Sequence, residues 1–330
     1  MSKLTTVKLD NTFNPKDIVV SDVVAPKKCG DMVKNARAAI GHKSMKSVTP
    51  IPDQGKYRSN ESYLYLILDG TAIGIYQSYE YGQPRTEKNV KGFDLVIPLV
   101  GKRDSVDPDE DDEVFWALDG MHQRVIKHLV KNKDSLPRDF RKLSDEDLCK
   151  IIRPPYTPKY KSKKDGKTRS PSLSIPFKYY KGDSKRGKKE ALITKCRGPG
   201  NKPFHPRDYL SIPGEKTVCG KIRAAIRVCH IGFSSKDNPE DLDGPRKLSV
   251  NYTLELANLN FTPITGGEEP DILGGNFDQD TGEETNDEAI YGKEDLVDVD
   301  DEEFGDEDDD ENDENEESAS PEPKKSRRRR

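Results

Sequence analysis

The sequence is poor in the residues that build disulfide frameworks, metal sites and membrane spans. It holds five Cys, five His, four Met and a single Trp among 330 residues, and 32% of its residues are hydrophobic. The odd number of cysteines and the absence of a Cys-x-x-Cys pair argue against a disulfide framework and a zinc module. No window approaches the roughly 18 uncharged apolar residues of a membrane span, and the start MSKLTTVKLD lacks a signal-peptide core. We therefore expect an intracellular protein in a reducing compartment.

Motifs for enzymatic chemistry are also missing. The sequence contains neither a G-x-x-x-x-G-K-[ST] loop nor a G-x-G-x-x-G loop, and its histidines form no His-x-x-x-His pair. The carboxylate run Asp107–Glu113 is the remaining metal candidate, and Asp109, Asp111 and Asp112 would serve a metal-dependent nuclease. A contiguous acidic run is more often a solvated loop or a helix start. We predict no catalytic residues, no metal and no cofactor.

Charge is distributed in blocks along the chain. Up to Gly267 the sequence has 48 Lys and Arg against 33 Asp and Glu, whereas Glu268–Glu322 holds 27 acids and one base, Lys293. The final segment Pro323–Arg330 adds six positive charges. A cationic body therefore carries a polyanionic tail. Such a body attracts polyanions, and its own tail competes for the same surface.

Most of the positive excess lies between Lys150 and Cys229, where 22 Lys and Arg face five acids and Tyr and Phe are interleaved. Aromatic faces stack exposed bases at about 1–3 kcal/mol each while cations neutralise phosphates, a combination that suits single strands better than duplexes. A single lysine is more often a solvated loop residue than a binding residue. We therefore predict nucleic-acid binding from the charge and aromatic content of the whole segment, and not from any one lysine. The predicted nucleic-acid-binding residues are Lys159, Tyr160, Lys161, Lys163, Lys164, Arg169, Lys178, Tyr179, Tyr180, Lys185, Arg186, Lys188, Lys189, Arg197, Lys202, Phe204 and Arg207.

Local patterns predict strands before and after one long helix. The β-rich runs Glu61–Leu68 and Thr71–Tyr79 flank Asp69-Gly70, which predicts a hairpin, and Lys91–Val100 extends it to an antiparallel meander. Helical spacing then predicts a helix over about 112–131. Later strands are predicted at Ser172–Tyr180, Glu190–Lys195, Thr217–Phe233 and Leu248–Phe261. In the last of these, apolar and polar residues alternate, which predicts one buried face and one face exposed to solvent.

A second, short helix is predicted before Arg153-Pro154-Pro155. Ser144 and Asp147 have capping-box spacing at its start, and the prolines forbid its continuation. This order of strands, inserted helix and strands predicts a mainly β fold, with an elaborated oligonucleotide-binding (OB-fold) barrel as the leading candidate.

Composition divides the chain into four parts. We predict an N-terminal extension over 1–52, a nucleic-acid-binding domain over 53–266, a disordered acidic tail over 267–322 and a basic terminus over 323–330. Hydrophobic residues within the tail, including Phe304, are typical of docking segments that recruit proteins, and a purely solubilising tail is the alternative. The terminus favours a nuclear import receptor, with tail pairing or phosphate contact as the alternative; its cations are Lys324, Lys325, Arg327, Arg328, Arg329 and Arg330.

The layout resembles a known group. The inserted helix, the basic and aromatic midsection, the segments AAIRVCHIGF and KLSVNYTLELANLNFTP and the acidic tail resemble the phage-type single-stranded DNA-binding proteins of giant eukaryotic DNA viruses. The resemblance covers Asp53–Phe304. It implies an OB-fold barrel that coats single-stranded DNA during viral replication, recombination and repair, in the host nucleus or a viral factory, with a tail that recruits replication proteins. In the phage relatives the tail ends in an aromatic residue, whereas here Phe304 lies inside it.

Two functional classes follow from these patterns. The first is a non-enzymatic single-stranded DNA-binding protein in which Tyr179, Tyr180 or Phe204 stacks bases. The second is a structural protein that packages duplex DNA or chaperones basic proteins through its acidic tail. Preference for poly-dT over duplex distinguishes them. The sequence leaves open whether the chain forms homo-oligomers and whether it prefers DNA or RNA.

Overall fold

The fold comes from a computed structural model of the chain. It describes residues 4–24, 36–49, 63–79, 85–86, 89–100, 112–161, 168–182, 189–212, 216–236 and 247–264, which belong to one compact unit. The predictions for the acidic tail with Phe304, the basic terminus, the acidic run before Asp112 and the loop cations Lys163, Lys164, Lys185, Arg186 and Lys188 lie outside these residues.

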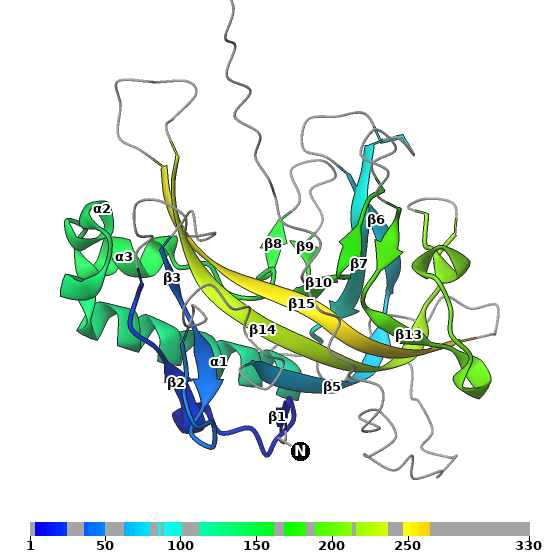
Figure 1. The fold of residues 1–330 in the computed structure, drawn as a ribbon, viewed down its shortest axis with the longest axis horizontal. Coiled ribbons are helices and arrows are strands. Elements are labelled where there is room, and N and C mark those ends of the chain that lie inside the picture. The colour runs from blue at the N-terminus through cyan, green and yellow to red at the C-terminus, as the bar shows by residue number, and fades with distance from the viewer. Residues whose placement is uncertain are drawn as a thin grey trace, which may run out of the picture. The chain divides into compact units, whose positions relative to one another are not determined.

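Two long antiparallel strands form the centre of the fold. β14 (Gly220–Lys236) and β15 (Lys247–Pro263) each have 17 residues and pair along their whole length in a strongly curved ribbon (Figure 1). They belong to a sheet with the order β1-β5-β14-β15-β13, to which β3 adds by pairing with β14. The other strands of this sheet are β1 (Thr5–Lys8), β3 (Arg37–Ala38), β5 (Leu64–Ala72) and β13 (Lys195–Arg197).

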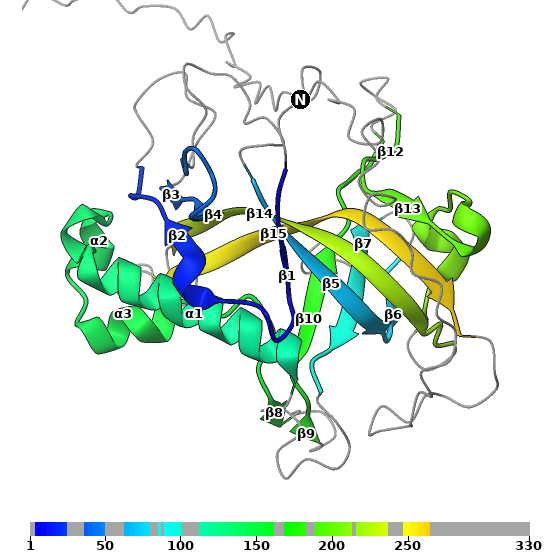
Figure 2. The same cartoon turned by 90° about the horizontal axis from the view of Figure 1, so that it is seen from below.

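A second sheet and a helix lie against the curved sheet. The sheet has the order β10-β7-β6, and in both views it lies along one half of the β14–β15 ribbon while α1 lies along the other (Figures 1 and 2). Its strands are β6 (Gly74–Tyr79), β7 (Val90–Pro98) and β10 (Ser172–Pro176). Three two-stranded pairs complete the described strands: β2 (Ile18–Val20) with β4 (Ile40–His42), β8 (Tyr160–Lys161) with β9 (Thr168–Arg169), and β11 (Tyr179–Tyr180) with β12 (Ala191–Leu192).

The predicted helices are confirmed with their caps. α1 (Glu113–Lys131) begins after Asp112, whose Oδ1 accepts a 2.6 Å hydrogen bond from the Phe115 N–H. α3 (Asp145–Ile151) begins after Ser144, whose hydroxyl accepts from the Asp147 N–H, and it ends before the prolines. The remaining helical turns are α2 (Arg138–Arg141), η1 (Pro15–Asp17), η5 (Lys133–Ser135), η6 (Pro199–Asn201) and η7 (Pro206–Tyr209).

One hydrophobic core joins the two sheets and α1. Leu66 of β5, Leu95 of β7, Leu118 of α1 and Phe261 of β15 are at most 1% exposed. They belong to one cluster of buried side chains. The mainly β fold with an inserted helix is thereby confirmed, with the large sheet curled as a half-barrel.

The predicted hairpin at Asp69-Gly70 is wrong. Both residues lie inside β5, where Asp69 pairs with Arg223 and Gly70 with Ile222 of β14. The chain bends only at Ile73, after which β6 enters the other sheet and pairs with β7 as predicted. The ladder to β14 continues past the Asp-Gly pair, and an Asp69–Arg223 ion pair with a 3.4 Å separation crosses it. Tertiary pairing thus overrides the local preference for a turn.

A bulge explains where the alternation in β15 changes. The predicted alternation between more buried and more exposed side chains holds through Leu254 and Leu256, which are both buried. The register then shifts, because Ile226 pairs with Leu256 and Ala225 with Asn258, which leaves Ala257 as the extra residue. A bulge of one residue moves the following side chains to the other parity, so Leu259 is the next apolar residue in the core.

Candidate nucleic-acid interface

The β8–β9 hairpin carries Tyr160, the most exposed of the aromatic residues predicted to bind nucleic acid, whereas the rings predicted to stack bases, Tyr179, Tyr180 and Phe204, are half-buried. Tyr160 is 50% exposed and pairs with Arg169, while Lys161 pairs with Thr168. Arg169, opposite Tyr160 in the pair, and Lys159 and Lys161, which adjoin it in the sequence, are exposed. The hairpin therefore presents an accessible aromatic face between cations, which is the combination that binds a single strand through its bases and phosphates.

The hairpin is rooted in the second sheet. Thr157 N–H donates to the Ser172 carbonyl at 2.8 Å, and Ser172 N–H donates back to the Thr157 carbonyl at 3.0 Å. Ser172 is also the first residue of β10 and pairs with Pro98 of β7. The base of the hairpin is thus fixed to a buried sheet.

A second group of predicted residues surrounds Phe93 of β7. The Phe93 ring is 1% exposed and meets the ring of Tyr179 edge to face at 5.2 Å and the ring of His205 at 5.5 Å. The guanidinium of Arg207 lies 5.6 Å from the Phe93 ring centre. We call Phe93, Tyr179, Glu190, His205 and Arg207 the Phe93 cluster. Its members come from β7, β11, the segment before β12, and η7 with its cap.

Glu190 partly neutralises the Phe93 cluster. Its Oε1 accepts a 2.8 Å hydrogen bond from Arg207 Nη1 and lies 3.6 Å from His205 Nε2. Burial and the Glu190 carboxylate raise the pKa of Tyr179, whereas burial and the Arg207 cation lower the pKa of His205. Because Arg207 is 44% exposed at its side chain, this ion pair contributes little to stability and leaves the guanidinium accessible to a phosphate.

Other predicted residues are engaged in packing or local contacts. The ring of Phe204 packs against Tyr209 at 4.9 Å and against Phe261 at 6.1 Å, so it belongs to a three-ring cluster at the edge of the core. Arg197 donates from Nη1 to the Asn201 carbonyl at 3.3 Å. Tyr180 and Lys178 are half-buried, whereas Lys189 and Lys202 are exposed.

The predicted residues thus gather at two places. The β8–β9 hairpin joins the start of β10 through Ser172, and Tyr179 follows the end of β10 at Pro176. The five residues of β10 span about 17 Å, at about 3.3 Å per residue. Figure 2 shows the hairpin and β12 on opposite sides of the second sheet.

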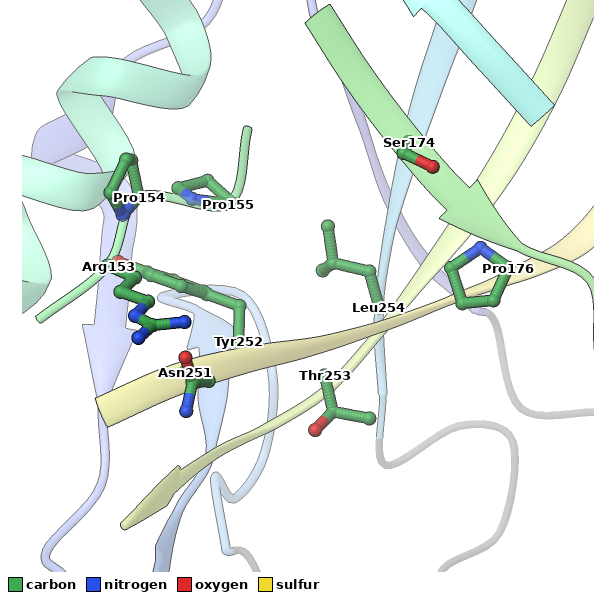
Figure 3. A pocket seen from close by; sticks show the side chains of 9 residues that line it. All are labelled: Arg153, Pro154, Pro155, Ser174, Pro176, Asn251, Tyr252, Thr253 and Leu254. Atoms are coloured by element: carbon green, nitrogen blue, oxygen red, sulfur yellow. The ribbon is translucent and has the colours of Figure 1, made fainter. Parts of the chain in front are cut away.

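Sequence reasoning missed a groove next to β10. It has a volume of about 310 Å³ and is lined by Arg153, Pro154, Pro155, Ser174, Pro176 and the β15 residues Asn251–Leu254 (Figure 3). The signal available in the sequence was Arg153-Pro154-Pro155, which we had interpreted only as the end of a helix. Its position beside β15 depends on contacts between segments about a hundred residues apart in the sequence.

The described part of β14 also carries cations that the sequence analysis did not select. Arg227 is bonded to Glu255 of β15, and its guanidinium lies 4.9 Å from the ring centre of Tyr63. Burial lowers the pKa of Arg227, but the opposing effects of Glu255, Cys229 and Tyr63 together raise this pKa overall. Burial raises the pKa of Glu255, but Arg227, Lys178 and Cys229 together lower this pKa overall. This pair joins two strands and is a structural element.

Two features are absent from the described residues, a cluster of metal ligands and a membrane-spanning helix. Within the part of the chain that the structure describes, no three His, Cys, Asp or Glu side chains are grouped as metal ligands. No helix in the same ranges is long and apolar enough to cross a membrane. Burial raises the pKa of the Cys196 and Cys229 thiols to about 12, so neither is an activated nucleophile.

Comparison with known proteins gave no family and a weak structural likeness. No known protein family matches the sequence, and no curated protein matches it. A solved structure of gp2.5, a single-stranded DNA-binding protein encoded by bacteriophage T7, is similar at 13% sequence identity over 66% of this chain and 98% of that chain. The TM-score of 0.22 is too low to support a functional conclusion.

Proposed function

We propose that this protein is a non-enzymatic single-stranded DNA-binding protein built on an elaborated OB-fold barrel. The observation that carries the proposal is the half-exposed ring of Tyr160 on a hairpin whose neighbouring Lys159, Lys161 and Arg169 are exposed. A duplex hides its base faces, whereas an unpaired base is free to stack on such a ring.

The two cationic places at the ends of β10 suggest how a strand is held. Phosphates bind the hairpin cations first, because their charges are exposed and attract a polyanion over several ångströms. Tyr160 then stacks one base. At the other end of β10, the partly exposed guanidinium of Arg207, which is held by Glu190, adds positive charge on the path of the strand.

The acidic tail is proposed to regulate this surface. Residues 267–322 compete with DNA for the cations of the body, and DNA binding frees the tail, with Phe304, to recruit replication proteins. Deletion of residues 268–330 is expected to tighten DNA binding at low salt, with a smaller effect at high salt because screening weakens the competition. Unchanged or weaker binding by the deletion variant would contradict self-competition.

The setting of the protein is proposed from the resemblance to proteins of giant DNA viruses. It coats single-stranded DNA during viral replication, recombination and repair, in the host nucleus or a viral factory. The terminal cations Lys324 to Arg330 bind a nuclear import receptor. Fusion of residues 323–330 to a fluorescent reporter tests this role, since a reporter that stays evenly distributed would refute it.

The stacking role of Tyr160 is tested by two substitutions. Tyr160→Ala removes the ring and is expected to weaken binding to a dT oligonucleotide by roughly tenfold, whereas Tyr160→Phe retains the π face and binds like the wild type. Fluorescence anisotropy at one fixed salt concentration measures both. Equal affinities of the alanine variant and the wild type would refute the proposed role of the hairpin.

A further inference from the structure

The groove beside β10 has proline rings on its walls and a strand as its floor. Pro154 and Pro155 lie on one side and Pro176 on the other, and the Leu254 side chain is directed between them (Figure 3). The volume of about 310 Å³ lies at the lower end of the range of small-ligand sites, about 300–1,000 Å³. A planar ring fits such a space, whereas a helix does not.

On its edge away from β14, and before it pairs with β13 at Asn258, β15 is joined to other described segments at two points. The Arg153 N–H donates to the Val250 carbonyl at 3.0 Å. Further along the strand, a parallel bridge joins Phe177 to Leu256. These two points bracket the groove.

The backbone between these points is available to a ligand. Along an antiparallel strand, N–H and C=O groups alternate between its two neighbours, so Tyr252 and Leu254 turn theirs to the same edge as Val250. No described residue makes a hydrogen bond to them on that edge. The groove floor therefore offers donors and acceptors in a fixed row, next to the proline rings.

The end of the groove near Arg153 is held in place. The hydroxyl of Tyr252 is hydrogen-bonded to Nδ1 of the buried His122 at 3.0 Å, and their rings lie 5.8 Å apart. Arg153 itself is exposed beside Tyr252 (Figure 3). A site whose walls are fixed before binding loses less conformational entropy when a ligand enters.

The groove opens at the foot of the cationic hairpin. The Thr157–Ser172 pair that roots the hairpin lies two residues after Pro155 and two residues before Ser174. A strand whose phosphates bind Lys159, Lys161 and Arg169 therefore passes close to the groove opening. This continuity favours a nucleic acid over a peptide as the occupant.

We infer that the groove binds one unstacked base of the bound strand. The flat faces of the base lie against the proline rings and Leu254, its polar edge bonds to the backbone of Tyr252 and Leu254, and Arg153 binds the adjoining phosphate. Bases that have left the stack are recognised in this way, by apolar contact with their faces and hydrogen bonds to their edges. The inference rests on the proposed function and adds a base-reading site to it.

Filling the groove tests the inference. Ser174 is exposed on β10 and lines the groove, so Ser174→Tyr occupies the space without altering the core. Thr262→Tyr, at an exposed position near the far end of β15, is the matched control. Each variant is titrated with a dT oligonucleotide and with an abasic oligonucleotide of equal length, which has phosphates and no bases.

We expect Ser174→Tyr to weaken dT binding by roughly tenfold and to leave abasic binding unchanged, because about 1.4 kcal/mol from one base contact corresponds to a factor of ten. Thr262→Tyr is expected to match the wild type on both oligonucleotides. Equal losses on both oligonucleotides, or no loss on either, overturn the inference while the proposed function stands. Failure of the wild type to bind either oligonucleotide refutes the proposed function itself.

A photo-cross-linking residue at position 174 gives a second, independent measurement. With bound dT oligonucleotide it is expected to form a protein–DNA adduct that disappears when an excess of unlabelled dT is added. An adduct to polypeptide alone would show that the groove holds an extended protein segment, and no adduct would show that it stays empty. Both results overturn the inference.

Discussion

The hydroxyl of Tyr252 in β15 lies 3.0 Å from Nδ1 of His122 in α1. This hydrogen bond connects the inserted helix to the long ribbon directly beneath the proposed base site. Tyr156 makes a neighbouring link by donating to Asp119 Oδ1 at 2.9 Å, and its ring contacts Phe115 at 5.1 Å. α1 is thus joined by hydrogen bonds to the ribbon at Tyr252 and to the segment after α3 at Tyr156.

His122 makes stability dependent on pH. Burial lowers the pKa of His122 from 6.5, with a smaller opposing effect of Asp119. The His122 side chain therefore binds a proton more readily in the unfolded chain than in the folded protein. The contribution of neutral His122 to the free energy of unfolding is fully present above about pH 6.5, and it is lost as the pH falls through the pKa of His122 in the folded protein. We expect His122→Gln to lose less unfolding free energy than the wild type between about pH 7 and pH 5 in urea titrations. Identical pH dependence in the two proteins would contradict this.

The ion pair of Arg227 and Glu255 stabilises the ribbon only while both partners are present. Glu255→Ala leaves a largely buried guanidinium without its carboxylate, and we expect a loss of about 2 kcal/mol in unfolding free energy. This is less than the roughly 3–5 kcal/mol for fully buried pairs, since the Glu255 side chain keeps 26% exposure. The double variant Arg227→Met with Glu255→Leu is expected to recover most of the loss. A double variant that is less stable than Glu255→Ala would contradict this account.

The placement of Gly70 inside β5 gives a direct test of the corrected topology. Gly70 has no positive φ, and a Cβ added there meets only Leu68 Cδ2 at 3.6 Å. Gly70→Thr is therefore expected to stabilise the protein by about 0.5 kcal/mol, because β-branched residues suit strands. Gly220→Ala is the contrast, since its Cβ comes within 2.5 Å of the Phe261 ring, and about 1–3 kcal/mol should be lost. If calorimetry shows that Gly70→Thr destabilises the protein, the placement of Gly70 inside β5 is contradicted and a turn at Asp69-Gly70 is favoured.

Local sequence signals predicted the elements, whereas distant pairings decided the topology. The helix after Asp112 and the cap at Ser144 were predictable because capping and helical periodicity act within a few residues. The role of Asp69-Gly70 was not, because it depends on Arg223, more than a hundred residues away. Residues 4–24 and 36–49, taken from sequence as part of an extension, supply β1 and β3 to the central sheet through pairings that no local pattern indicates.

The candidate site was predictable in composition and unpredictable in arrangement. The excess of cations and rings between 150 and 229 is a property of the sequence, and Tyr160 is indeed exposed among cations. Which rings are available depends on packing, since Phe204 lies against Tyr209 and Phe261. The groove combines Arg153, Ser174 and Leu254, which approach one another only through the sheet.

The hairpin cations are expected to determine the salt dependence of binding. On a single strand, each phosphate contact contributes about 0.7 units to the slope of log affinity against log salt. Replacing Lys161 and Arg169 by Gln should therefore reduce the magnitude of this slope by about 1.4 units. Lys142→Gln, at an exposed position beyond α2, is the matched control and should leave it unchanged. An equal effect of the control would mean that binding responds to net charge alone.

Competition between a dT oligonucleotide and a duplex of equal length, at one salt concentration, tests the central claim most directly. The wild type is predicted to retain dT in the presence of excess duplex, and Tyr160→Ala is predicted to lose most of that preference. A wild type that binds duplex as well as dT, with no effect of Tyr160→Ala, would contradict single-strand binding and favour a protein that packages duplex DNA.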